Sequence, residues 1–170
     1  MTRTLWFLFF PLLVLLAGCG YHRPGVGDNL GEVRTLRIPL FANETYEPYL
    51  ENELTNAITE RFLRTRRWRL VETPDAADAV FSGTVSSYRS VPVSFDRNDN
   101  ILEYRSEMTV SAVLRSSDEG RVLWKGKASW SEEYPGLLDK GRQEDQETEA
   151  IRAIAERIAE ELYFRLADNF

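Results

Sequence analysis

Polar and apolar residues alternate along most of the chain after residue 33, and two stretches replace this alternation with a longer period. The alternation covers the segments 35–40, 68–71, 79–95, 102–114 and 122–130. It predicts strands, because successive side chains of a strand point to opposite faces of a sheet. Pro39 indicates that the first strand ends there or lies at the edge of a sheet.

The two stretches with the longer period predict amphipathic helices, each with one apolar stripe. The first can open at Pro48, and its stripe consists of Leu50, Leu54, Ala57, Ile58 and Phe62. The second is expected from about Asp145, and its stripe consists of Ile151, Ile154, Ala155, Ile158, Leu162 and Leu166. Together these elements predict an α+β fold, a two-layer sandwich with two helices on one face of a mostly antiparallel sheet of about four to five strands.

The segments 79–95 and 102–114 are expected to form a long hairpin around the turn formers at 96–100. Its arms cover about 14 to 17 residues, whereas a typical strand has about 5 to 6. Val91, Val93 and Phe95 continue the alternation that we expect to face inward. A hairpin of this length should project beyond the helices, and its tip is a candidate contact surface.

The first 18 residues predict a targeting segment. Arg3 precedes an apolar run over 5–16, small residues follow it, and this order is typical of a secretory signal. The run is shorter than the roughly 20 apolar residues that span a bilayer. Leu16-Ala17-Gly18-Cys19 matches the bacterial lipobox, whose cysteine is acylated after cleavage. We therefore predict a lipoprotein signal peptide at 1–18 and a lipid anchor at Cys19, with an outer-membrane address from Gly20.

The segment 19–32 is rich in glycine and is expected to link the anchor to a single domain at 33–170. The one cysteine is used by the lipobox, and the one histidine, His22, lies in this linker. No second ligand is available for a zinc site, and neither a nucleophile elbow nor a phosphate-binding glycine loop is present. We expect no enzyme activity, no metal and no cofactor.

Acidic residues outnumber basic ones, and removal of residues 1–18, which contain one charged residue, changes the formal charge from −6 to −7. This balance argues against binding to nucleic acid. Basic residues nevertheless gather around the end of the first helix: Arg61, Arg64, Arg66, Arg67 and Arg69. They either complement the helix dipole as solvated charges or form an anion site, since guanidinium groups bind phosphate and carboxylate bidentately.

Two further cations stand alone, Arg97 at the hairpin tip and Lys140 in the expected loop before the last helix.

Three stretches around the anchor and the hairpin resemble the LPS-assembly lipoproteins of the LptE family, where LPS is lipopolysaccharide. They are Leu16-Ala17-Gly18-Cys19-Gly20-Tyr21-His22, the stretch from Phe95-Asp96-Arg97-Asn98 to Glu103-Tyr104, and Met108-Thr109-Val110-Ser111-Ala112-Val113.

The resemblance implies an outer-membrane lipoprotein that faces the periplasm and plugs the lumen of a large β-barrel, the LPS translocon LptD. It also implies that the chain helps this barrel to assemble and binds LPS during transport to the outer leaflet. Arg97 and Lys140 match the basic positions that the family uses for LPS contact. LptD, LPS and the outer membrane are therefore the expected partners.

A second interpretation stays open from the first half of the domain. The first strand, Asn43-Glu44-Thr45, the helix and the stretch 66–71 also resemble the opening of periplasmic modules that activate cell-wall synthases or support secretion. Such a lipoprotein would bind a protein and no LPS. The long hairpin with Glu103-Tyr104 favours the LPS interpretation.

Overall fold

The computed structural model describes residues 33–168, so the predicted signal segment 1–18, the linker 19–32 and Cys19 lie outside the described residues. The described chain forms β1 (Thr35–Arg37), β2 (Ala42–Asn43), α2 (Leu50–Thr65), β3 (Arg69–Leu70), the 3₁₀ turn η3 (Pro74–Ala76), β4 (Ala79–Phe95), β5 (Ile101–Ser116), β6 (Val122–Pro135) and α3 (Lys140–Ala167). Each predicted strand and both predicted helices are present, and β2 is an additional strand.

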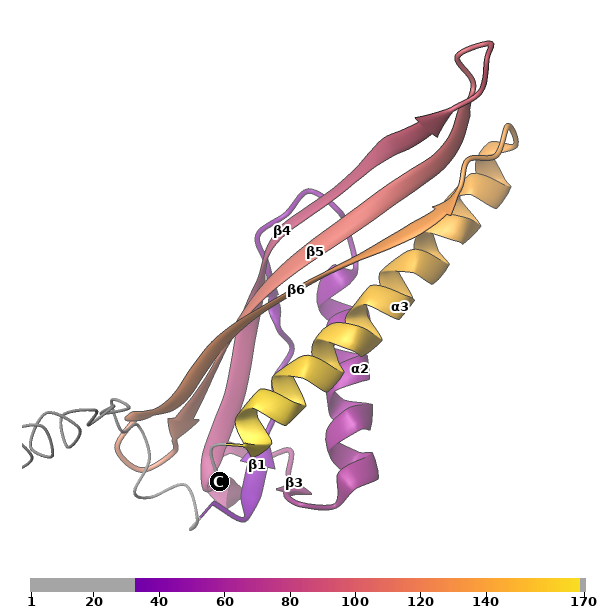
Figure 1. The fold of residues 1–170 in the computed structure, drawn as a ribbon. Helices are drawn as coiled ribbons and strands as arrows, with labels where there is room; N and C mark the ends of the chain where they lie inside the picture. The colour runs from indigo at the N-terminus through magenta and orange to yellow at the C-terminus, as the bar shows by residue number, and fades with distance from the viewer. Residues whose placement is uncertain (1–32, 169–170) are drawn as a thin grey trace, which may run out of the picture.

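The strands form one six-stranded sheet in the order β3-β1-β4-β5-β6, and β2 also pairs with β4. The predicted α+β sandwich with both helices on one face of the sheet is confirmed (Figure 1). The sheet is mixed, however, and not mostly antiparallel: β1 is parallel to β3 and β4, and β2 is parallel to β4. The parallel pairs arise because α2 is a helical crossover, which returns the chain to the sheet in the same direction.

The core lies between the sheet and the two helices. The Phe62 ring of α2 is its centre: the ring centroid lies 5.5 Å from that of Trp68 and 5.3 Å from those of Phe81 and Tyr163. The predicted apolar stripe of each helix is largely buried against these rings and the sheet. Burial of each large apolar side chain contributes about 1.5–3 kcal/mol, so this layer is the main source of stability.

One glycine lets the segment around β2 cross the sheet closely. The buried Phe41 ring lies directly on Gly83 of β4, and a side chain at Gly83 would overlap both this ring and the carbonyl oxygen of Ser111. Phe41 also packs against Phe81, with ring centroids 6.0 Å apart. The absence of a side chain at Gly83 thus positions the loop that leads into α2.

The last helix begins earlier than the sequence predicts, at Lys140 and not near Asp145. Asp139 caps it, because its Oδ1 accepts a hydrogen bond of 2.9 Å from the backbone N–H of Arg142. Lys140 is therefore the first helical residue and does not lie in a loop. The buried residues of α3 start only at Ala150, so the first turns carry no apolar stripe that a periodicity could reveal.

The distal half of the long hairpin also differs from the prediction. A β-bulge between Val85 and Ser87 shifts the register with β5, so the alternation that buries Phe81 and Val85 does not continue in phase. Val91, Val93 and Phe95, which we expected to face inward, are exposed. They lie on the part of β4 that extends away from α2 (Figure 1).

Candidate functional site

The tip of the β4–β5 hairpin is a tightly bonded loop that presents Arg97 to solvent. Asp96 organises it: its Oδ1 accepts hydrogen bonds from the backbone N–H groups of Asn98 (2.7 Å) and Asn100 (2.9 Å), and its Oδ2 accepts from the Asn100 side chain (2.9 Å). These bonds, the Asn100 side chain first, hold the pKa of Asp96 below its usual range. Asp99 completes the turn with φ of 63°. The Arg97 backbone is thus fixed, and its side chain is free to reach a ligand.

The start of α3 lies at the same end of the molecule as the hairpin tip (Figure 1). The loop before it is held to the hairpin by a 2.8 Å hydrogen bond from the Gly136 N–H to the Leu102 carbonyl. The Leu137 N–H also donates to Gln143 Oε1 of α3, at 2.6 Å. Lys140 follows at the first helical position and is exposed. The structure therefore brings the two predicted cations, Arg97 and Lys140, to one end of the fold, which we call the distal end.

Exposed apolar side chains accompany these cations. Leu138, beside the N-cap of α3, is 96% exposed, and Phe95, beside the tip loop, is 53% exposed. The other exposed apolar residues of this end are Val91, Val93 and Leu102. Large apolar side chains that gather on an exposed surface mark contacts with other molecules. The distal end thus combines two exposed cations with apolar surface, although Asp96, Asp99 and Asp139 lie beside these cations in the sequence.

A buried polar network fixes the hairpin to α3 below the distal end. Tyr88 of β4 donates a 2.7 Å hydrogen bond to Glu147 Oε1 of α3 and lies 2.8 Å from the hydroxyl of Ser106, which is fully buried. Because Tyr88 has one proton to donate, its oxygen accepts from Ser106. Ser90 and Tyr134 form a second pair, at 2.7 Å. Burial is the main reason that the pKa values of both tyrosines are raised.

Our sequence analysis did not identify this network. Tyr88 and Ser90 belong to the polar phase of the alternation, which we expected to face outward, and only the bulge before them turns them towards α3. Tyr104 and Tyr134 extend the same side of the sheet with stacked rings, 5.6 Å between centroids. The angle of the hairpin relative to α3 is therefore set by directed hydrogen bonds as well as by apolar packing.

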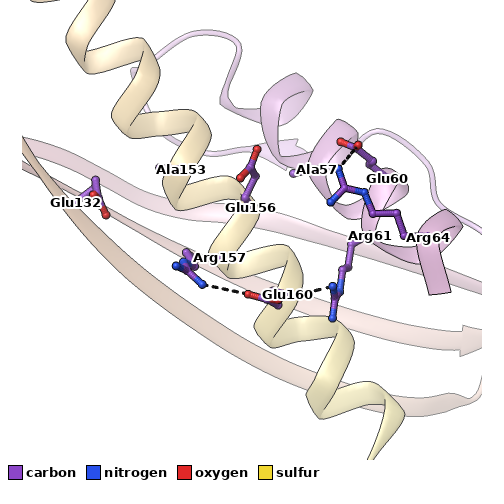
Figure 2. Close-up of a pocket in the computed structure, with 9 residues that line it drawn as sticks. All are labelled: Ala57, Glu60, Arg61, Arg64, Glu132, Ala153, Glu156, Arg157 and Glu160. Carbon is purple, nitrogen blue, oxygen red and sulfur yellow. Dashed lines mark hydrogen bonds and ion pairs between the residues drawn. The ribbon is translucent and has the colours of Figure 1, made fainter.

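The predicted arginine cluster is divided by the structure. Arg61 points into a groove of about 300 Å³ between α2 and α3 (Figure 2). Its guanidinium lies 5.1 Å from the Tyr163 ring centroid and 4.9 Å from that of Phe164, and its Nη1 is 3.6 Å from Glu160. The Nε of Arg61 is buried without a hydrogen-bond partner. Arg61 thus joins the two helices, and Arg64 is the other arginine of the cluster that lines this groove.

The other four arginines are exposed. Arg64 forms an ion pair with Glu60 at 2.5 Å, one turn back on the same helix. Arg66 ends α2 in the left-handed conformation, with φ of 53°, and Arg67 lies over the Trp68 ring, 5.2 Å from its centroid. Arg69 follows on β3. The prediction of an anion site at this cluster stays open, and no observation in the described chain gathers these side chains around one ligand.

Residues 33–168 hold no group of three or more histidine, cysteine, aspartate or glutamate side chains placed to bind a metal ion. Within the same range no helix is both long enough and apolar enough to cross a membrane. The candidate site is therefore the distal end, a surface of cations and apolar side chains that offers contacts to another molecule.

Comparison with known proteins agrees with this description. The fold resembles rare lipoprotein B from Shewanella oneidensis (TM-score 0.54, 15% identity, 79% of this chain and 95% of that chain covered). It also resembles lipoprotein B from Nitrosomonas europaea (0.52, 14%, 76% and 79%) and a minor lipoprotein from Acinetobacter baumannii (0.51, 14%, 80% and 92%). At these identities the likeness shows the fold alone. No curated protein matches the sequence.

The sequence model of one family covers nearly the whole described domain, and its description is lipopolysaccharide assembly. It matches residues 33–166, which include both helices, the hairpin and the distal end. This match does not depend on the predicted lipobox, which lies before it. The chain belongs to the lipopolysaccharide-assembly family LptE.

Proposed function

We propose that this chain is an outer-membrane lipoprotein, anchored through Cys19 on the periplasmic side, that plugs the LPS translocon β-barrel, assists its assembly and binds LPS. The observation that carries the proposal is the distal end, where Arg97 and Lys140 lie with exposed apolar side chains. LPS has phosphate groups beside acyl chains, so a ligand of this kind matches both properties of the surface.

The charge distribution along α3 supports an anionic ligand at its start. The first turn contains no acidic residue, and both Lys140 and Arg142 lie in it. A cation at a helix N-terminus opposes the helix dipole and costs about 0.3–1 kcal/mol. The Asp139 carboxylate already supplies negative charge to this N-terminus, because it accepts a hydrogen bond from the Arg142 N–H. A phosphate would therefore be bound by the side chains of Lys140 and Arg142.

The face of the sheet opposite the helices supports the plug. It is uncovered in the described chain (Figure 1) and carries serine, threonine and paired charges. Arg89 pairs with Glu107 at 2.5 Å, and Arg105 pairs with Glu133 at 2.5 Å, each across neighbouring strands. A barrel lumen is usually polar, so a polar face of this kind fits its wall.

LPS binding can be tested by titration of purified LPS into the full chain. The Arg97→Glu and Lys140→Glu variants should each bind about tenfold more weakly, because each loses a charge-assisted contact to phosphate. Arg121→Glu is a matched control, since Arg121 is exposed at the opposite end, beside the β5–β6 turn. Equal affinity of all three variants would exclude the distal end as the LPS site.

The partner is tested by purification of the acylated protein from its native outer membrane, with mass spectrometry of the proteins that come with it. A large β-barrel in equal amount supports the plug. A cell-wall synthase or a secretion component in its place would favour the second interpretation of the sequence. Arg97 and Lys140 would then be surface charges with no role in LPS binding.

A further inference from the structure

The edge of β4 that faces away from β5 pairs with other strands in its first half and is unpaired in its second half. β1 pairs with Ala79 and Val80, and β2 pairs with Thr84 and Val85. The last backbone bond on this edge runs from the Glu44 N–H to the Val85 carbonyl, at 3.1 Å. From Ser86 to the end of β4 no strand of the described chain pairs with this edge. Unpaired strand edges of this kind accept a strand from another chain.

The open edge has a defined length. It starts at Ser86, directly after the β2 pairing, and Pro92 limits it at the other end, because proline has no N–H to donate to a ladder. The other side of β4 is paired with β5 along the whole strand. The stretch from Ser86 to Val91 therefore offers backbone groups to one short extended segment, which would continue the line of β1 and β2.

A groove runs beside this open edge. It has a volume of about 420 Å³ and is lined by the loop residues 44–47, by 86–90 of β4 and by Glu147 of α3. The loop forms one wall, the strand edge forms the other, and Glu147 comes from the helix layer below. An added strand would thus place its alternate side chains in the groove.

The groove is acidic. Glu44, Glu47 and Glu147 line it, whereas its single cation, Arg89, donates two hydrogen bonds to Glu107 on the neighbouring strand. Burial, and then the charge of Glu147, raise the pKa of Glu47. A positive group in the groove would relieve the repulsion between these two carboxylates.

We propose that the β4 edge from Ser86 to Val91 and the adjoining acidic groove form a docking site for an extended segment of a partner protein that carries lysine or arginine. The backbone of the segment pairs with β4, and its basic side chains lie between Glu47 and Glu147. This is strand addition, in which main-chain hydrogen bonds give affinity and side-chain pockets give specificity. The site is separate from Arg97 and Lys140 and does not depend on LPS binding.

Charge favours a different protein over a second copy of this chain. Pairing of two copies through the same edge would bring their acidic grooves together, and like charges in close contact oppose association. A basic partner segment removes this repulsion. The occupant is therefore a partner with positive side chains on alternate positions, since these share one face of a strand.

The probe for this site is a nine-residue peptide of threonine and valine with two lysines two positions apart. Fluorescence anisotropy measures its binding to the full chain, and hydrogen exchange measures protection of the amides from 86 to 91. Two matched peptides serve as controls, one with glutamate in place of lysine and one with N-methylated central amides. We expect saturable binding of the lysine peptide, protection confined to the β4 edge, and much weaker binding of both controls.

Protein variants separate the charge contribution from the fold. Glu47→Gln and Glu147→Gln should each weaken binding of the lysine peptide about fivefold, the upper range for one exposed charge pair. Glu156→Gln, at an exposed position of α3 that lines the separate groove between α2 and α3, should leave it unchanged. The proposal would be overturned if the lysine peptide showed no saturable binding, or if the glutamate or N-methylated peptide bound equally well. It would also be overturned if protection of the β4 edge rose with protein concentration in the absence of peptide, because this would indicate pairing of two copies.

Discussion

Replacement of Tyr88 by phenylalanine tests how the hairpin is held to α3. The change removes one oxygen and keeps the ring, so apolar packing against the sheet is preserved. It deletes the 2.7 Å hydrogen bond to Glu147 and the 2.8 Å contact with Ser106. Glu147 belongs to α3 and Ser106 to β5, so the substitution removes the side-chain hydrogen bonds from Tyr88 of β4 to both elements.

The magnitude follows from burial. A hydrogen bond to a charged group contributes about 1.5–3 kcal/mol, and a buried hydroxyl left without its partner costs about 1–3 kcal/mol. The second cost is partial here, because Ser106 also interacts with Tyr134. We expect Tyr88→Phe to lower the free energy of unfolding by about 2–3 kcal/mol, which corresponds to roughly 2–4 °C in Tm per kcal/mol for a domain of this size.

Urea unfolding of the full chain, followed by circular dichroism, measures this change. Tyr46→Phe is the control, because Tyr46 is fully exposed and its loss should stay within about 0.5 kcal/mol. A double-mutant cycle with Glu147→Ala should give a coupling energy of about 1 kcal/mol or more. Additive effects of the two substitutions, or a loss as small as that of the control, would refute the role of the network.

Four further outcomes are expected. Cys19→Ala should release the protein from membranes, and unchanged membrane fractionation would contradict the predicted anchor. Ile154→Ala and Ile158→Ala should each destabilise the domain by about 2–5 kcal/mol in thermal unfolding, because both side chains are fully buried. Gly83→Ala should destabilise it by about 1–3 kcal/mol in urea unfolding, since the new methyl group overlaps a buried ring and a backbone carbonyl. Hydrogen bonds from the backbone N–H groups of Arg34 and Thr35 lower the pKa of Asp78. The ionised carboxylate should therefore stabilise the fold fully above its unfolded pKa of about 3.9, and this stabilisation should be lost as pH falls from there through the lower folded pKa. Asp78→Asn should accordingly flatten the acid limb of a profile of stability against pH.

The sequence predicted the elements of this fold where apolar residues follow a regular period against a core. The stripes of α2 and of the second half of α3 are such cases, with Ile58 and Ile154 fully buried. The prediction failed for Val91 because a bulge near Ser86 changes which face the next residues of β4 occupy, and two further register shifts lie between Pro92 and Phe95. A one-residue irregularity of this kind leaves no trace in a pattern of alternation.

The start of α3 was missed for a related reason. The ten residues before Ala150 form helix without a buried side chain of their own, and only the cap at Asp139 signals where the helix begins. The mixed sheet could not be foreseen either, because the short strands β1, β2 and β3 contain too few residues to indicate the direction of their partners. The sequence did locate both cations of the distal end, but their shared position depends on the lengths of the hairpin and of α3.

The mixed sheet also has a consequence for the order in which the chain folds. β4, β5 and β6 are joined by short turns, so they can pair as soon as they are available. The pairing of β1 with β4 instead joins residues about 40 positions apart, such as Leu36 and Ala79, and contacts between distant residues form more slowly. The part of the chain that is synthesised first is therefore placed last. Until it arrives, a strand of 17 residues has one edge open to aggregation, so a holding chaperone should be most useful before β1 and β2 are in place.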